Sequence, residues 1–210
     1  ERYKKNIELL QNNNVYSKEM EHDACGVGLV ASTQGKKSRE VVEYGIEALK
    51  AVWHRGAVDA DGKTGDGAGI HLEIPKDFFI EKIEITGHKF DNAEICVGMI
   101  FLPRNNFESQ ETSRTIIERE LTKSNFSIYG WRQVPVNPKV LGEKADSTRP
   151  EIAQVLFKHN DIDLNGKDLE RRLYETRRKI ENESIKDSLD GLYICSLSSK
   201  SIIYKGMFLA

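Results

Sequence analysis

The sequence predicts an α+β fold in which largely antiparallel sheets are covered by helices. Two strand-like segments, 192–197 and 202–209, follow each other directly and are separated by a turn near 199–200. Two other segments, one around Ile116 and one over 169–180, have apolar residues at helical spacing. A doubly wound parallel sheet would alternate strands with helices, so consecutive strands favour antiparallel pairing.

The N-terminal part of the chain begins with a polar segment, followed by a short apolar run and a helix. Residues 1–24 are polar and are expected to form a leader outside the core. The run 27–31 is short and rich in valine, which predicts a buried strand. Ser38 is placed to cap the next helix, whose apolar positions extend to Trp53. Gly56 stands where a left-handed cap would end that helix.

The remaining elements are predicted from apolar periodicity and from the turn residues that interrupt it. Ser109 is expected to open one helix, and the arginine pairs of the 169–180 helix are expected to form a solvated face. Further strands are expected at 70–75, 95–102, 129–136 and 153–157.

The composition indicates a globular protein and excludes several classes. The 210 residues are 39% hydrophobic and 30% charged, with a formal net charge of −2, which gives no general field for nucleic acid or anionic lipid. No apolar run approaches the roughly 18 residues of a membrane span. The three cysteines are widely spaced, which argues against a disulfide framework or a metal site and favours a reducing compartment.

Cys25 stands at the head of the first apolar run, directly after the leader. A free cysteine is most often a buried core residue, and this interpretation applies to Cys96 and Cys195 in their apolar strands. A nucleophilic thiol needs a base, and neither His22 nor His54 is a compelling partner. Cleavage before Cys25 would instead create an α-amine with a pKa of about 7.7–8.0 beside the thiol, able to act as the base.

The loop 59–69 carries four glycines and three aspartates. It matches neither of the usual glycine-rich phosphate-binding patterns, and it resembles a calcium loop only loosely. A flexible loop beside a pocket and a simple long turn both explain the glycines.

Three blocks in register, at 21–28, 54–57 and 61–69, closely resemble the start of the glutamate synthase large subunit. Shorter similarities follow at 129–135 and 203–207. The resemblance is to the N-terminal class II glutamine amidotransferase domain of that family. It implies a propeptide over 1–24 and the N-terminal part of the amidotransferase domain over 25–210.

The resemblance also implies a fold and a site. The fold would be that of an N-terminal-nucleophile hydrolase, a four-layer αββα sandwich of antiparallel sheets. Cys25 would become the first residue after propeptide removal and attack the side-chain amide of glutamine. Arg55 would support the glutamine site from its loop, although a helix-capping arginine remains the alternative.

For the full-length enzyme the resemblance implies a synthase domain in the same chain. That domain would use FMN and a 3Fe-4S iron–sulfur cluster, and a small reductase subunit or ferredoxin would supply electrons. No cofactor or metal is expected in this segment itself. The expected location is the bacterial cytoplasm, with a plastid as the alternative.

The family's substrate-carboxylate arginine and oxyanion donors lie in blocks that would follow Ala210. The 210 residues are therefore expected to be a C-terminally truncated fragment with little glutaminase activity. Two other interpretations stay open: another class II amidotransferase, such as the phosphoribosyl-, glucosamine- or asparagine-forming enzymes, and a non-catalytic amidotransferase-like interaction module.

Overall fold

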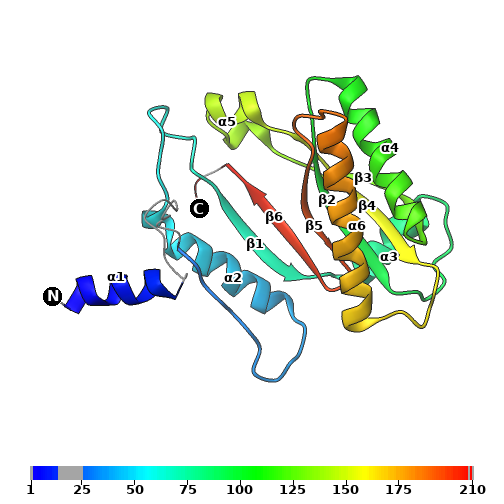
Figure 1. Cartoon of the computed structure of the whole chain (residues 1–210), viewed down its shortest axis with the longest axis horizontal. Coiled ribbons are helices and arrows are strands. Elements are labelled where there is room, and N and C mark those ends of the chain that lie inside the picture. Colours follow the sequence, from blue (N-terminus) through cyan, green and yellow to red (C-terminus); the bar gives the residue numbers. More distant parts are fainter. Residues whose placement is uncertain (1, 14–25, 208, 210) are drawn as a thin grey trace.

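The structure, a computed structural model, describes residues 2–13, 26–207 and 209 (Figure 1). Its strands form two antiparallel sheets, a four-stranded sheet in the order β3-β4-β2-β5 and a two-stranded sheet of β1 and β6. The predicted antiparallel α+β fold is confirmed. The strands are β1 (Ala68–Glu73), β2 (Ile95–Leu102), β3 (Phe126–Gln133), β4 (Glu151–His159), β5 (Tyr193–Ser198) and β6 (Ser201–Gly206).

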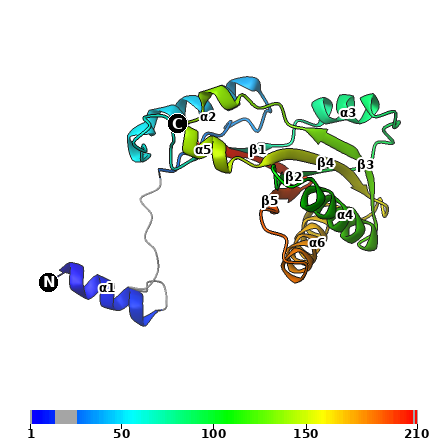
Figure 2. The ribbon, with the colours of Figure 1, turned by 90° about the horizontal axis from the view of Figure 1, so that it is seen from above.

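Helices cover these sheets on two sides. Figure 2 shows α4 and α6 on one side of the four-stranded sheet, with α3 and α2 on the other side. None of the described helices is both long and apolar enough to cross a membrane. The helices are α1 (Arg2–Asn12), α2 (Arg39–Ala51), α3 (Lys76–Ile85), α4 (Phe107–Lys123), α5 (Glu143–Thr148) and α6 (Gly166–Lys186), with short 3-10 turns η1 (Trp53–Arg55) and η2 (Pro138–Val140).

Strand β2 lies at the centre of the core and is covered on both faces. Its alternate residues Cys96 and Ile100 join the cluster formed with α4 and α6. The residues between them, including Val97 and Met99, join a second cluster with α3, β1 and β6. This period of two explains why the segment is a continuous apolar run, as strands buried on both faces are.

The two long helices were predicted correctly from their apolar spacing. Leu169, Leu173 and Ile180 are fully buried on one face of α6. Helix α4 begins slightly before the predicted position, because the side chain of Asn106 accepts a hydrogen bond from the backbone N–H of Ser109 at 3.0 Å. Asn106 is therefore the N-cap.

The predicted hairpin near the C-terminus is wrong in its pairing. The turn lies where predicted, but β5 pairs with β2 and β6 pairs with β1, so the chain changes sheets there. The Glu170 carboxylate of α6 holds this corner by accepting hydrogen bonds from the hydroxyls of Ser198 and Ser199 and from the Ser199 backbone N–H. The strand partners and the contacts at the corner come from segments far along the chain, which local patterns do not reveal.

The predicted buried strand at 27–31 is also wrong. These residues lie outside any strand, and Val27 and Leu29 are 89% and 91% exposed. A strand needs a neighbour to pair its backbone polar groups, and none of the described strands pairs with this segment. It runs instead beside α2, where a Cβ on Gly28 would lie 3.8 Å from the Cβ of Ala48.

Several boundaries differ from the prediction. Helix α2 begins after Ser38, as predicted, but it ends at Ala51, and η1 follows. Gly56 has a φ of −83° and is extended, so it is no left-handed cap. Strand β3 begins and ends three residues earlier than predicted. The helices α1, α3 and α5 were missed: α1 lies in the segment predicted only as a polar leader, α3 has an indistinct apolar face, and α5 is only six residues long.

The buried carboxylate of Glu120 links α4 to its surroundings. It accepts hydrogen bonds from Arg119 at 3.0 Å and from Lys123 at 2.9 Å, and Arg119 also bonds Glu183 of α6 at 2.9 Å. Burial alone would raise the pKa of Glu120, but these two cations outweigh it and hold the pKa below its usual value. The stabilisation is therefore present above the unfolded pKa of about 4.3 and is lost as the pH falls through the lower folded value.

We expect Glu120→Gln to lower the free energy of unfolding at pH 7 by about 1 kcal/mol, because it removes the charge from a buried hydrogen-bonded group. Urea unfolding at pH 7 and again below pH 4 measures this, and the difference from the wild type should shrink at the lower pH. The control Glu175→Gln removes a single exposed pair with Arg172 and should change little. An equal loss at both pH values would contradict the prediction.

Candidate active site

The two predicted site residues are only partly covered by the structure. Cys25 lies outside the described residues, and the described chain resumes at Gly26. Arg55 lies in η1, directly after α2, and its side chain is also outside the described part. The elements that hold the chain around these positions therefore define the candidate site.

The chain segments around the site come together at one end of the two-stranded sheet. Val58 and Gly65 form an antiparallel bridge, and the backbone N–H of Asp66 donates to the Ala57 carbonyl oxygen at 3.3 Å. Gly67, with a φ of +119°, lies against the end of β6, where a Cβ would be 3.4 Å from the Gly206 carbonyl oxygen. The loop that follows Arg55 is thus attached to both strands of this sheet.

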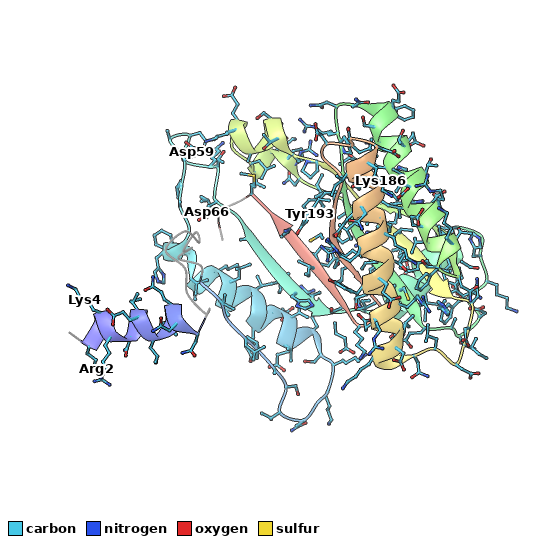
Figure 3. The ribbon with its side chains drawn as sticks, viewed as in Figure 1. Arg2, Lys4, Asp59, Asp66, Lys186 and Tyr193 are labelled. Atoms are coloured by element: carbon cyan, nitrogen blue, oxygen red, sulfur yellow. The ribbon has the colours of Figure 1, made fainter. Side chains whose placement is uncertain are left out.

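The loop between η1 and β1 is a compact turn, in agreement with one of the two interpretations of its glycines. The Asp59 N–H donates to the Thr64 carbonyl oxygen and the Gly62 N–H to the Asp59 carbonyl oxygen, both at 2.9 Å. Gly62 has a φ of +68°, a conformation that favours glycine. Asp59 and Asp66 mark the two ends of this loop in Figure 3.

Asp61 is the centre of the hydrogen bonds inside the loop. Its carboxylate accepts from the Thr64 hydroxyl at 2.6 Å, from the Thr64 N–H at 2.7 Å and from the Lys63 N–H at 2.9 Å. The Thr64 hydroxyl, followed by these backbone groups, lowers the pKa of Asp61 to about 2. The carboxylate is therefore charged at neutral pH and acts as a fixed acceptor.

Helix α5 packs directly on this loop. The Ala145 N–H donates to the Thr64 hydroxyl oxygen at 3.4 Å, and Lys144 pairs with Asp59 at 2.6 Å. There is no room for a side chain at Gly142, because a Cβ would lie 2.0 Å from Asp61 Oδ2 and 2.2 Å from Thr64 Oγ1. Sequence analysis missed this contact, since α5 is distant along the chain and too short to show periodicity.

Gly69 is explained by the packing of the β1–β6 sheet, without a role in phosphate binding. It lies opposite Lys205 in the β1–β6 register. A Cβ there would be 2.8 Å from the Lys205 Cβ and 2.9 Å from the Tyr204 carbonyl oxygen. Close approach of two backbones explains this glycine. Among the residues that the structure covers, no group of three or more His, Cys, Asp or Glu could hold a metal ion.

The other candidate side chains are accounted for. Cys96 and Cys195 are buried in strands, which confirms that they are core residues, and burial raises the pKa of each thiol, which disfavours the reactive thiolate. His54 is exposed in η1, whereas His22 lies outside the described residues. Two surface hollows lie elsewhere, one between α6 and β5 and one beside 91–94 and 161–165.

Comparison with known proteins shows the family. Residues 25–210 match the family model of class-II glutamine amidotransferases. The chain is 51% identical over 208 residues to the large chain of NADPH glutamate synthase from Azospirillum brasilense, covering 99% of this chain and 14% of that protein. It is 39% identical over 203 residues to a ferredoxin-dependent glutamate synthase from Pyropia yezoensis, covering 95% and 13%.

A third relative is the large chain of NADPH glutamate synthase from Bacillus subtilis, 35% identical over 197 residues, which cover 92% of this chain and 12% of that protein. The chain therefore spans only 12% to 14% of the length of these three relatives. The match to the family model, in contrast, extends over almost the whole chain, and the resemblance inferred from the sequence blocks is confirmed. The chain belongs to the class-II glutamine amidotransferase family.

Proposed function

We propose that this chain supplies the glutamine-hydrolysing half of a glutamate synthase. The observation that carries the proposal is that the family match begins at Cys25, the residue that would become the N-terminus after leader removal. The relatives named above are glutamate synthases with either NADPH or ferredoxin in their names, which supports this branch of the family. In this scheme 1–24 is the leader and 25–210 is the amidotransferase part.

The proposed reaction uses two groups of Cys25, its α-amine and its side-chain thiol. Once the peptide bond between Ala24 and Cys25 is cut, the free α-amine of Cys25 takes the thiol proton. The thiolate sulfur attacks the amide carbon of the glutamine side chain, and the α-ammonium returns the proton as the carbon–nitrogen bond breaks. Ammonia leaves and a thioester remains. Water, activated by the same amine, hydrolyses the thioester to glutamate and restores the thiol.

The packing of the described elements supports a four-layer αββα arrangement for the domain. Helices α4 and α6 cover one face of the four-stranded sheet, and the β1–β6 sheet lies against its other face. Helix α2 packs on β1. In this arrangement η1, which carries Arg55, lies at the end of the outer helix, where it supports glutamine binding.

The ammonia would pass to a synthase region of the same chain and aminate 2-oxoglutarate. FMN and an iron–sulfur cluster would supply the electrons for reduction there, with a small reductase subunit or ferredoxin as their source. The described residues do not fit such a cluster, because Cys96 and Cys195 are both buried singly in strands and no described group of potential ligands could hold a metal ion. These groups belong outside this segment. We place the protein in the bacterial cytoplasm or, in a plant-type host, in a plastid.

The test is the N-terminus of the protein purified from its native host. We expect an intact mass that starts at Cys25, and labelling by a cyanobenzothiazole, which reacts with an N-terminal 1,2-aminothiol. The same protein made with its leader retained is the control and should not be labelled. A native protein that keeps residues 1–24 would contradict the mechanism and favour a non-catalytic interaction module.

A further inference from the structure

The turn η1, which carries Arg55, is attached to the rest of the molecule at two ends. At one end the N–H of Val52 bonds the Leu49 carbonyl oxygen and continues α2. At the other end, the Val58–Gly65 bridge joins the turn to the compact loop. Among the residues here whose exposure is described, Trp53 is 66% exposed, and Val58 at the bridge is 52% exposed. Packing of Trp53 and His54 therefore contributes little to the position of the turn, which depends on where the loop is held.

The loop is held by α5, and α5 is in turn tied to the four-stranded sheet. Asp146 of α5 accepts hydrogen bonds from Arg104 at 3.3 Å and from Arg149 at 2.9 Å. Arg104 closely follows the end of β2, and Arg149 closely precedes β4. Ala145, which donates to Thr64, is 2% exposed. Helix α5 is thus attached to the four-stranded sheet by these hydrogen bonds and by the burial of Ala145.

Thr64 and Asp61 connect helix α5 to the loop. The hydrogen bonds run in one direction, from the Ala145 N–H to the Thr64 hydroxyl and from that hydroxyl to the Asp61 carboxylate. Thr64 is 3% exposed, so these bonds are shielded from water on the Thr64 side. Successive hydrogen bonds of this kind polarise and strengthen each other. The missing side chain of Gly142 is what allows the approach.

We propose that Asp61 and Thr64 are positioning residues, which fasten the loop to α5 and thereby hold the Arg55-bearing turn in place for glutamine binding. The proposal rests on the proposed function and adds residues to it that act through Arg55. It concerns binding of glutamine and not the chemistry at Cys25, which is supplied by a different segment. The expected signature is therefore a weaker affinity for glutamine at an almost unchanged maximal rate.

The experiment measures glutamine-dependent and ammonia-dependent glutamate formation by the full-length protein. We expect Asp61→Asn and Thr64→Val each to raise the KM for glutamine about tenfold or more, because a misplaced substrate-positioning group is costly even when the shift is small. The kcat should change less than threefold, and the ammonia-dependent rate should stay at the wild-type level. Thr64→Ser keeps the hydroxyl and should restore a KM within twofold of the wild type.

Two further variants separate positioning from general stability. Gly142→Ala changes the N-cap residue of α5, where the added methyl group would push α5 and the loop apart. It should raise the KM for glutamine in the same way. The double variant Gly142→Ala/Thr64→Val should raise the KM for glutamine by less than the product of the two separate fold-increases, since both substitutions break the same contact. Glu120→Gln, which weakens the fold far from the loop, is the matched control and should leave the KM unchanged. Thr64→Val keeps the side-chain volume, so it carries the test if Asp61→Asn does not fold.

The proposal is overturned if Asp61→Asn and Thr64→Val fold normally and keep a KM for glutamine within twofold of the wild type. It is also overturned if both activities fall together in proportion to unfolded protein. Failure of the proposed function has a different result, because the wild-type protein itself would then show no glutamine hydrolysis that depends on Cys25.

Discussion

Replacing Cys25 by alanine is expected to lower glutamine-dependent glutamate formation by about 10⁴-fold or more, because no other described group can replace the thiolate as nucleophile. Cys96 and Cys195 are buried with raised thiol pKa values, so neither can substitute. The loss should be confined to the first half of the reaction. Ammonia added directly enters after this step and should still be converted.

The measurement compares glutamine and ammonium chloride as nitrogen donors for the full-length protein. Cys195→Ala is the control, since it removes a buried thiol of the same chain without touching the site, and it should keep both activities below its unfolding temperature. If Cys25→Ala keeps glutamine-dependent activity within tenfold of the wild type, Cys25 is not the nucleophile.

Truncating Phe157 to alanine is expected to lower the free energy of unfolding by about 3–5 kcal/mol, a large part of the roughly 5–15 kcal/mol typical of a domain. Phe157 lies in β4, is fully buried, and meets Phe126 edge to face with ring centroids 5.2 Å apart. It belongs to the cluster that joins the sheet to α4 and α6. Removal of the ring would leave a cavity that the surrounding strands and helices can fill only in part.

Urea unfolding of the 210-residue chain gives the free energy directly. Phe107→Ala is the matched control, because that side chain is 76% exposed at the start of α4 and its loss should change stability by less than about 0.5 kcal/mol. If Phe157→Ala lowers the free energy of unfolding by less than about 1 kcal/mol, the surrounding core has closed around position 157 without leaving a cavity, and the prediction is wrong.

Local patterns predict those elements whose burial is periodic along the chain. The α6 residues Leu169, Leu173 and Ile180 share one face, and the continuous apolar run of β2 is covered on both sides. In both cases the residues that pack inward recur at the period of the element itself. The pattern is then visible without knowledge of the partner.

Local sequence patterns give a wrong prediction where the structure of a segment depends on which distant segment it pairs with. An apolar run at 27–31 looks like a strand, but no described strand pairs with it. The β5–β6 turn looks like a hairpin, but Glu170 of α6 holds it as a corner between two sheets. In each case the outcome depends on whether residues far along the chain pair with the segment, which its own pattern does not reveal.

The candidate site shows the same division. The sequence by itself determined the class-II amidotransferase family, through blocks of adjacent residues around Cys25, Arg55 and the glycine loop, and the family match confirms it. The roles of Cys25 and Arg55 stay predictions. Only the tertiary structure revealed that the glycine loop is a compact turn held against α5, because Asp61 and Gly142 are about eighty residues apart and come into contact only when the chain folds.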